Sequence, residues 1–121
     1  MAIHTILIVD DSATERYYLS EMLVRAGYAV FTAQDGADAL AQLKQARPDL
    51  ILMDVVMPGA NGFQITRAIA RDPELQDVPV IICSSKSQET DRIWGLRQGA
   101  RDYLVKPVVE AELLAKIAAI S

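Results

Sequence analysis

The stretch "TILIVDDSATE", residues 5–15, carries the pattern that decides the fold. Within it, "TILIV" is a short apolar run, which is typical of a strand that is covered on both faces of a parallel sheet. Two adjacent aspartates, Asp10 and Asp11, follow at once. Ser12 and Glu15 then have the spacing of a capping box, which predicts that a helix begins here. The stretch therefore predicts a buried strand, an acidic loop and a helix, in that order.

The same alternation of strand and helix patterns repeats five times along the chain. The expected strands are short runs rich in apolar and β-branched residues, at 5–9, 28–33, 50–54, 78–85 and 102–105. Each is followed by a segment with apolar residues at helical spacing. Parallel strands need long right-handed crossovers, so this order predicts a doubly wound α/β fold with a five-stranded parallel sheet flanked by five helices.

Length and composition limit the class of protein. At 121 residues, about half of them apolar, the chain has the size of one domain, which we expect to span 1–121. No apolar run approaches the ~18 residues of a membrane span, and no cationic leader precedes the first strand. A net charge of −4 disfavours nucleic-acid binding. The single cysteine, Cys83, lies in the apolar run "PVIIC", which predicts a buried thiol in a reducing, cytoplasmic environment.

Polar residues follow the ends of four expected strands. They are Asp10 and Asp11, Asp54, Ser84 and Lys106, after the first, third, fourth and fifth strands. In doubly wound sheets, ligands bind beyond the carboxyl ends of the strands. If the first and third strands are neighbours, the three carboxylates crowd one pocket, and each like-charge pair about 5 Å apart costs on the order of 3 kcal/mol. A hard cation relieves this repulsion, so the residues predict half of a Mg²⁺ site that awaits a phosphoryl oxygen.

The other polar side chains that follow the expected strands are suited to phosphoryl transfer. Lys106 adds a positive charge, Ser84 adds a hydroxyl donor, and Asp54 is a candidate nucleophile because a carboxylate can form an acyl phosphate. Taken alone, an aspartate pair is most often a helix-start signal. A dehalogenase-type phosphatase would need Asp-x-Asp where the chain has Asp10-Asp11-Ser12, and two carboxylates would repel the phosphate of a flavin.

At these residues the sequence resembles the response-regulator receiver domains of two-component signalling. The segments "ILIVDDS", "DLILMDVVMPGANG", "PVIICSS" and "GARDYLVKP" stand where that family carries its acidic pair, phosphoacceptor loop, hydroxyl strand and Lys-Pro. The resemblance implies a flavodoxin-like sheet of order 2-1-3-4-5. It also implies a signalling protein that takes a phosphoryl group from a histidine kinase or a histidine phosphotransfer domain, and not a turnover enzyme.

The resemblance implies a role for each matching residue of the acidic pocket. Asp54 is the phosphoacceptor. Asp10 and Asp11 hold Mg²⁺ together with Asp54 and the backbone carbonyl of Val56. Lys106 contacts the phosphoryl group. In this family the aspartate is modified once per chain, whereas a phosphatase turns over many substrate molecules, so the resemblance predicts stoichiometric self-phosphorylation.

The resemblance further implies a conformational switch. Ser84 is the switch hydroxyl, where the family more often has threonine, and the missing methyl group predicts looser rotamer control. Tyr103 is the aromatic rotamer switch. The expected output is the binding of a downstream protein to the face formed by the helix at 87–98, the strand at 102–105 and the last helix. Trp94 on this face is either a core residue or a partner contact.

A narrower resemblance concerns "SKSQETDRIWGLRQGARDYLVKP", residues 85–107. This segment is similar to the small stand-alone receivers of pilus-associated chemosensory systems, which act in twitching motility. It implies a receiver with no output domain. From the net charge and the lack of a long apolar run we further expect no nucleic-acid partner and no membrane insertion. The sequence is also compatible with a piece of a longer regulator, because it stops at "AKIAAIS" within the last expected helix.

Overall fold

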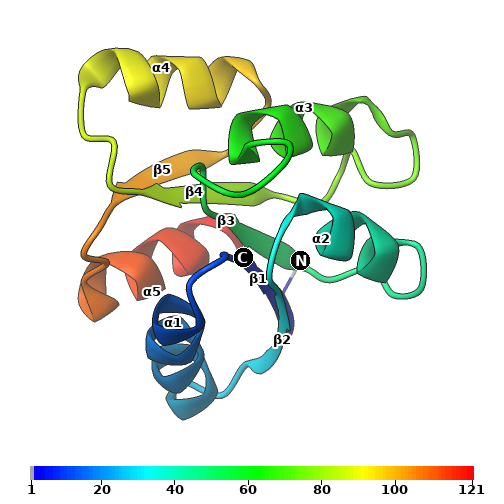
Figure 1. The fold of residues 1–121 in the computed structure, drawn as a ribbon. Helices are drawn as coiled ribbons and strands as arrows, with labels where there is room; N and C mark the ends of the chain where they lie inside the picture. Colours follow the sequence, from blue (N-terminus) through cyan, green and yellow to red (C-terminus); the bar gives the residue numbers. More distant parts are fainter. Residues whose placement is uncertain (1) are drawn as a thin grey trace.

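The apolar runs of the sequence become the parallel strands of one sheet (Figure 1). The structure, a computed structural model, describes residues 2–121. The strands are β1 Thr5–Val9, β2 Ala29–Ala33, β3 Leu50–Met53, β4 Val80–Ser84 and β5 Asp102–Val105. The helices are α1 Ala13–Arg25, α2 Gly36–Leu43, α3 Gly62–Arg71, α4 Glu89–Arg97 and α5 Glu110–Ile120. The strand order β2-β1-β3-β4-β5 confirms the expected topology.

The sheet separates two apolar cores, because successive side chains of a strand point to opposite faces. Leu7 and Met53 pack in the core beneath α2 and α3, whereas Ile6 and Leu52 pack in the core beneath α1 and α5. Figure 1 shows α2, α3 and α4 on one face of the sheet and α1 and α5 on the other. All residues of β3 and β4 are buried, so the central strands are fixed from both sides. In contrast, α4 buries only Gly95.

The pairing register aligns the carboxyl ends of the strands. Val9 pairs with Met53, so the residues that follow them, Asp10 and Asp54, emerge side by side. The amide of Asp54 donates to the Val9 carbonyl at 2.9 Å, which extends the ladder by one residue. On the other side of β4, the amide of Lys106 donates to the Ser84 carbonyl at 2.8 Å. Backbone hydrogen bonds therefore hold the polar residues that follow the strands at the same end of the sheet, as expected.

Within residues 2–121, no helix has both the length and the apolar character that crossing a membrane requires.

Gly62 allows α3 to begin directly against the end of β3. Asn61 caps this helix, and its side chain accepts from the amide of Gln64 at 3.0 Å. The amide of Gly62 donates to the Val55 carbonyl at 2.9 Å. A Cβ atom at position 62 would lie 1.9 Å from the carbonyl oxygen of Asp54, so only glycine fits this contact without moving the backbone. The sequence pattern identified this segment only as a loop and did not indicate this contact.

We predict that Gly62→Ala destabilises the protein by about 1 to 3 kcal/mol, because the added methyl group must displace the backbone at Asp54. Gly36→Ala is the matched control. Gly36 is likewise the first residue of a helix after a capping residue, but its Cβ would clash only with the Ile65 side chain, which can move, and would lie at an ordinary contact distance of 3.7 Å from the Ala60 carbonyl oxygen. Urea unfolding should show a larger loss for Gly62→Ala than for Gly36→Ala. Equal losses would contradict the proposed contact.

Candidate functional site

Three aspartates converge at the carboxyl ends of β1 and β3. One carboxylate oxygen each of Asp10, Asp11 and Asp54 lies within 4.8 Å of the other two. Asp10 is 2% exposed and Asp54 is 7% exposed, whereas Asp11 is exposed to solvent. The structure therefore brings together the three carboxylates that the sequence predicted to crowd one pocket. Two of them are buried charges, which require partners.

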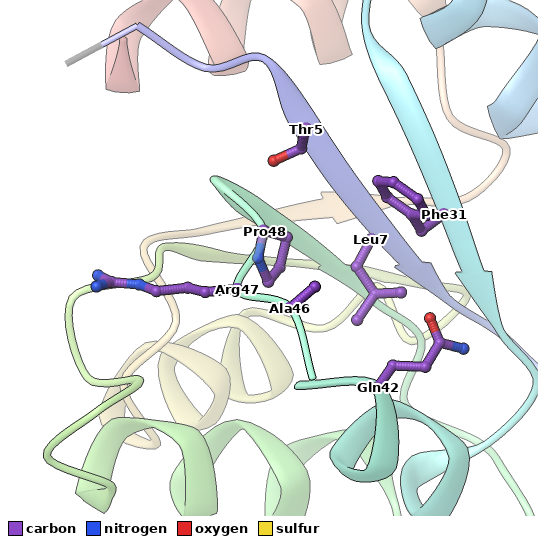
Figure 2. A pocket seen from close by; sticks show the side chains of 7 residues that line it. All are labelled: Thr5, Leu7, Phe31, Gln42, Ala46, Arg47 and Pro48. Atoms are coloured by element: carbon purple, nitrogen blue, oxygen red, sulfur yellow. The ribbon is translucent and has the colours of Figure 1, made fainter. Parts of the chain in front are cut away.

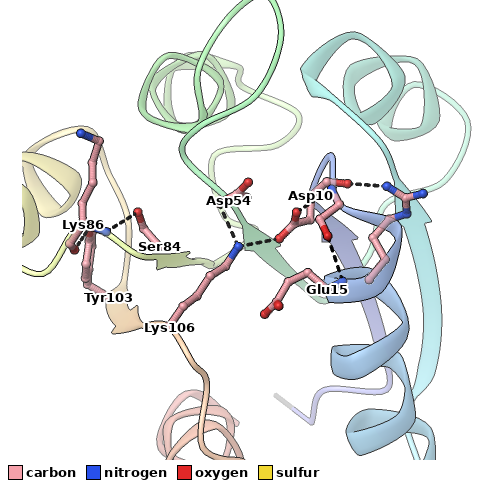
Figure 3. A network of polar contacts seen from close by, with 9 residues as sticks. Asp10, Glu15, Asp54, Ser84, Lys86, Tyr103 and Lys106 are labelled. Carbon is pink, nitrogen blue, oxygen red and sulfur yellow. Dashed lines mark hydrogen bonds and ion pairs between the residues drawn. The ribbon is translucent and has the colours of Figure 1, made fainter.

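The ammonium group of Lys106 lies between the two buried carboxylates (Figure 3). Its Nζ donates to Asp10 Oδ2 at 2.8 Å and to Asp54 Oδ1 at 3.1 Å. The lysine side chain itself is 18% exposed. Asp10 is held further by the Ser12 amide, which donates to its Oδ1 at 2.9 Å. The positive charge of Lys106 thus offsets part of the repulsion between the carboxylates of Asp10 and Asp54.

This arrangement shifts two pKa values. Burial raises the pKa of Asp54 above its ordinary value, and the neighbouring charge of Asp10 raises it further, against the opposing effect of Lys106. For Lys106, burial disfavours the charged form, but the hydrogen bond to Asp10 and the charges of Asp54 and Asp10 outweigh it, so the pKa of the ammonium is raised. Lys106 therefore stays protonated at neutral pH and balances one of the two buried carboxylates.

The donor set fits a hard divalent cation. All three side chains offer carboxylate oxygens, which suit Mg²⁺, and the exposed Asp11 leaves one side of the cluster accessible to solvent. In the part of the chain from residue 2 onward, the Val56 carbonyl accepts no backbone hydrogen bond, so its oxygen is available as a further ligand. The three carboxylates therefore form the acidic cluster that the resemblance to receiver domains predicts.

Ser84 and Tyr103 are connected through the backbone of one residue. Ser84 is buried at the end of β4, and its Oγ accepts from the amide of Lys86 at 3.1 Å. Tyr103 is buried at 6% exposure, and its hydroxyl donates to the carbonyl of Lys86 at 2.7 Å. Figure 3 shows this pair beside Lys106 and Asp54. Burial raises the pKa of the Tyr103 hydroxyl, which keeps it protonated as a donor.

Two expectations about single residues are settled by burial. Cys83 is fully buried in the core beneath α1 and α5, which raises the pKa of its thiol to about 12 and confirms the expectation of a buried, unreactive thiol. Trp94 is 49% exposed on α4, so of the two alternatives the core position is excluded.

The predicted capping box at the start of α1 is only half formed, and this corrects the sequence analysis. Ser12 Oγ accepts from the amide of Glu15 at 3.2 Å, as expected of the N-cap residue. The Glu15 side chain does not return the bond to the amide of Ser12, because that amide already donates to Asp10. Sequence reasoning also missed that Arg16 donates to the Asp10 carbonyl at 2.7 Å. The Asp10 contact joins residues two positions apart, a local turn typical of aspartate that the sequence analysis overlooked, whereas the Arg16 contact has no signal in the local pattern.

An apolar hollow of about 190 Å³ lies away from this site, toward the opposite ends of the strands (Figure 2). Thr5, the first residue of β1, and Pro48, which precedes β3, line one side of it. Phe31 and Gln42 line the side toward β2 and α2. The acidic residues follow the other ends of these strands, so the hollow is not part of the candidate site.

Known proteins share both the sequence pattern and the fold. The profile of the response regulator receiver domain matches residues 6–118. Protein PilH of Pseudomonas aeruginosa is 56% identical over 115 residues, which cover 95% of each chain. The phosphate regulon transcriptional regulatory protein PhoB of the same organism is 40% identical over 96% of this chain and 51% of its own length. The structure of the Vibrio cholerae chemotaxis protein CheY4 has a TM-score of 0.91 and 34% identity over 99% of this chain and 100% of its own.

The matched residues 6–118 include all four sequence segments on which the resemblance to receiver domains was based. Receivers of two-component systems take a phosphoryl group from a histidine kinase onto an aspartate of their own chain, so a histidine kinase is the class of partner. The family places this chain among signalling proteins and not among phosphatases. The chain belongs to the response regulator receiver domain family.

Proposed function

We propose that Asp54 is the phosphoacceptor and that Lys106 contacts the incoming phosphoryl group. The observation that supports this most directly is the position of the Lys106 ammonium, which lies between Asp10 and Asp54 at hydrogen-bond distance from both. A group that already holds one Asp54 oxygen can also bind a phosphoryl oxygen placed on that residue. Asp10, Asp11, Asp54 and the Val56 carbonyl would hold Mg²⁺, which neutralises charge on the phosphoryl oxygens when it is bound.

The transfer forms one bond and breaks another. A carboxylate oxygen of Asp54 attacks the phosphorus of a phosphohistidine, the new P–O bond forms, and the P–N bond breaks. The electron pair of the broken bond stays on the imidazole nitrogen, which remains with the kinase. Lys106 balances the charge that builds up on the transferred group.

We predict that acetyl phosphate adds one phosphoryl group to the wild-type protein in the presence of Mg²⁺, and that Asp54→Asn abolishes this addition, because an amide is not a nucleophile of this kind. The product should be stable in acid and labile in base, as expected of an acyl phosphate. Intact-mass spectrometry measures the extent of modification. Removing Mg²⁺ with a chelator should prevent it.

Asp77→Asn is the matched control for this experiment. Asp77 is exposed and makes no hydrogen bond or ion pair within residues 2–121, so its variant should be phosphorylated like wild type. Undiminished modification of Asp54→Asn would remove Asp54 from the proposed role. Loss of modification in both variants would point to an effect of charge or folding and not of the acceptor.

Ser84 and Tyr103 are proposed to couple the site to a binding surface. A phosphoryl group on Asp54 offers acceptor oxygens to the Ser84 hydroxyl. If the hydroxyl turns toward them, its bond from the Lys86 amide weakens, and the same residue holds the Tyr103 hydroxyl. The segment between β4 and α4 can therefore respond to phosphorylation. Exposed apolar side chains on α4 and β5, namely Ile93, Trp94 and Val105, support this face as the surface for a downstream protein.

We predict that beryllofluoride, a phosphoryl mimic, shifts the NMR signals of α4 and β5, including the Trp94 indole, and that Ser84→Ala strongly reduces these shifts. The coupling that the hydroxyl provides should amount to about 1 to 3 kcal/mol. Ser85→Ala is the control, because Ser85 is exposed and should leave the response intact. A response of Ser84→Ala equal to that of wild type would show that the coupling runs through another route, such as the loop of residues 55–62.

We further propose that this receiver acts in a pilus-associated chemosensory system that controls twitching motility. The 56% identity to PilH over 95% of both chains supports this, together with the resemblance of residues 85–107 to receivers of such systems. The level of identity to PhoB is lower, and this chain spans only half of that protein.

In a Pseudomonas aeruginosa strain that lacks PilH, we predict that this protein restores the normal twitching zone and that Asp54→Asn does not, because the output depends on the phosphoacceptor. The zone diameter on agar measures the effect, and immunoblotting verifies equal protein levels. Asp77→Asn should restore twitching like wild type. Failure of the wild-type chain at normal protein level would contradict the proposed pathway without affecting the proposed chemistry.

A further inference from the structure

A further hollow, of about 280 Å³, lies where the carboxyl-terminal ends of α3 and α4 meet. Figure 1 shows these two helices on the same face of the sheet. The residues that line this α3–α4 hollow come from both helices and from the turn after α4, and they are Arg67, Ala70, Arg71, Arg97, Gln98 and Gly99. The two helix ends are packed closely, because a Cβ atom at Gly99 would lie only 2.7 Å from the Cβ of Ala70. The hollow thus lies over a contact between two helices.

Three of the lining residues are arginines without an acidic partner in the described chain. The arginine ion pairs within residues 2–121 are made by Arg25 and Arg92, whereas Arg67, Arg71 and Arg97 form none. No acidic residue lines the α3–α4 hollow. Three positive charges gathered at one place repel one another, although the chain as a whole has a net charge of −4. The cluster therefore indicates a ligand of negative charge.

Helix dipoles account for only part of this arrangement. Arg71 and Arg97 lie in the last turns of α3 and α4, where positive side chains are favourable. Two helix ends together contribute about one negative elementary charge, which is less than the positive charge of the cluster. Arg67 lies in the middle of α3, and the carboxylate of Asp72, which ends this helix, accepts from the Glu74 amide at 2.8 Å. The α3–α4 hollow therefore keeps an excess of positive charge.

A buried amide adds an uncharged donor to the arginines. Gln98 is 7% exposed, and its Oε1 accepts a long hydrogen bond from Nη1 of Arg67 at 3.5 Å. Its Nε2 donates no hydrogen bond within residues 2–121 but retains contact with solvent. Because Gln98 lines the hollow, this nitrogen is a donor that a bound anion can use.

We propose that the α3–α4 hollow binds a phosphate group, with the guanidinium groups of Arg67, Arg71 and Arg97 and the Gln98 amide as donors. Guanidinium forks match the oxygens of phosphate and carboxylate groups. A phosphate dianion balances more of the positive charge than a single carboxylate does. At ~30 Å³ for each water-sized atom, 280 Å³ holds about nine such atoms, which is more than one phosphate group fills. The site therefore suits the phosphate of a small organic molecule as well as the free ion.

A ligand in this hollow would join two helices that differ in how firmly they are held. Arg67 and Arg71 belong to α3, which buries Phe63, Ile65 and Ile69. Arg97 belongs to α4, which buries only Gly95. An anion that contacts arginines of both helices therefore restrains the weakly packed α4 against the better packed α3.

Titrations of inorganic phosphate and of glycerol 3-phosphate, each in EDTA and followed by amide NMR shifts, test this inference. Without a metal ion the acidic pocket repels anions, so the signals of residues 67–71 and 97–99 should shift with saturation and those of Asp10 and Asp54 should not. Tighter binding of glycerol 3-phosphate would identify an organic phosphate as the ligand, and equal affinity would identify the phosphate group alone. We expect Arg67→Gln and Arg97→Gln each to weaken binding about tenfold, as the loss of a charge-assisted hydrogen bond predicts.

Arg47→Gln is the matched control. It makes the same charge change at an exposed arginine that forms no ion pair within residues 2–121 and lines the apolar hollow instead. This variant should bind both phosphates like wild type, and the amide spectrum of each variant verifies that it is folded. Equal weakening in all three variants would show a general effect of net charge and overturn the inference. Shifts in wild type that do not saturate, or that lie outside α3 and α4, would also overturn it.

Discussion

The ammonium group of Lys106, held between the carboxylates of Asp10 and Asp54, is the interaction on which the site depends. Two carboxylates that emerge from adjacent parallel strands repel each other, and their burial makes the repulsion stronger than in water. A buried charge without a partner is strongly destabilising, whereas a hydrogen-bonded ion pair makes its burial tolerable. The lysine therefore allows the fold to keep two aspartates in the same pocket. In the proposed function, the same charge would also bind a phosphoryl group on Asp54.

The sheet determines how accurately these charges are placed. Both faces of β3 and β4 are buried against helices, so the strands cannot shift their register without moving an entire core. Asp10, Asp54 and Lys106 each lie one residue beyond a strand, and backbone hydrogen bonds extend the ladders to all three. Gly62 adds a second constraint, because the start of α3 touches the carbonyl oxygen of Asp54 with no room for a side chain. The acidic pocket is thus rigid on the side of β1 and β3.

The opposite side of the pocket is held less firmly. The helix α4 buries only Gly95, and Trp94 is half exposed, so few apolar contacts oppose a displacement of this helix. The hydrogen bonds from Lys86 to Ser84 and from Tyr103 to Lys86 lie where this weakly packed segment joins β4. A rigid site next to a weakly packed helix is a suitable arrangement for a switch, because a local change at Asp54 can alter a neighbouring surface without disturbing the cores.

Local pattern in the sequence was sufficient to predict the fold class, the strand positions and the polar residues that follow the strands, whereas the strand order and the parts played by Val56 and Tyr103 came only from the resemblance to receiver domains. The β-branched runs indicate buried strands, and residues that follow parallel strands must meet at one edge, so the grouping of Asp10, Asp54, Ser84 and Lys106 followed from topology alone. Other features depend on contacts between residues far apart in the chain. The sequence could not show that Lys106 bridges two aspartates, that Trp94 is exposed, or that Gly62 contacts Asp54. The Lys106 bridge is the clearest case, because Lys106 lies 96 residues from Asp10 and 52 residues from Asp54 in the chain. Local spacing predicts where a strand ends and which side chain follows it, and only the tertiary structure decides which distant side chain becomes its partner.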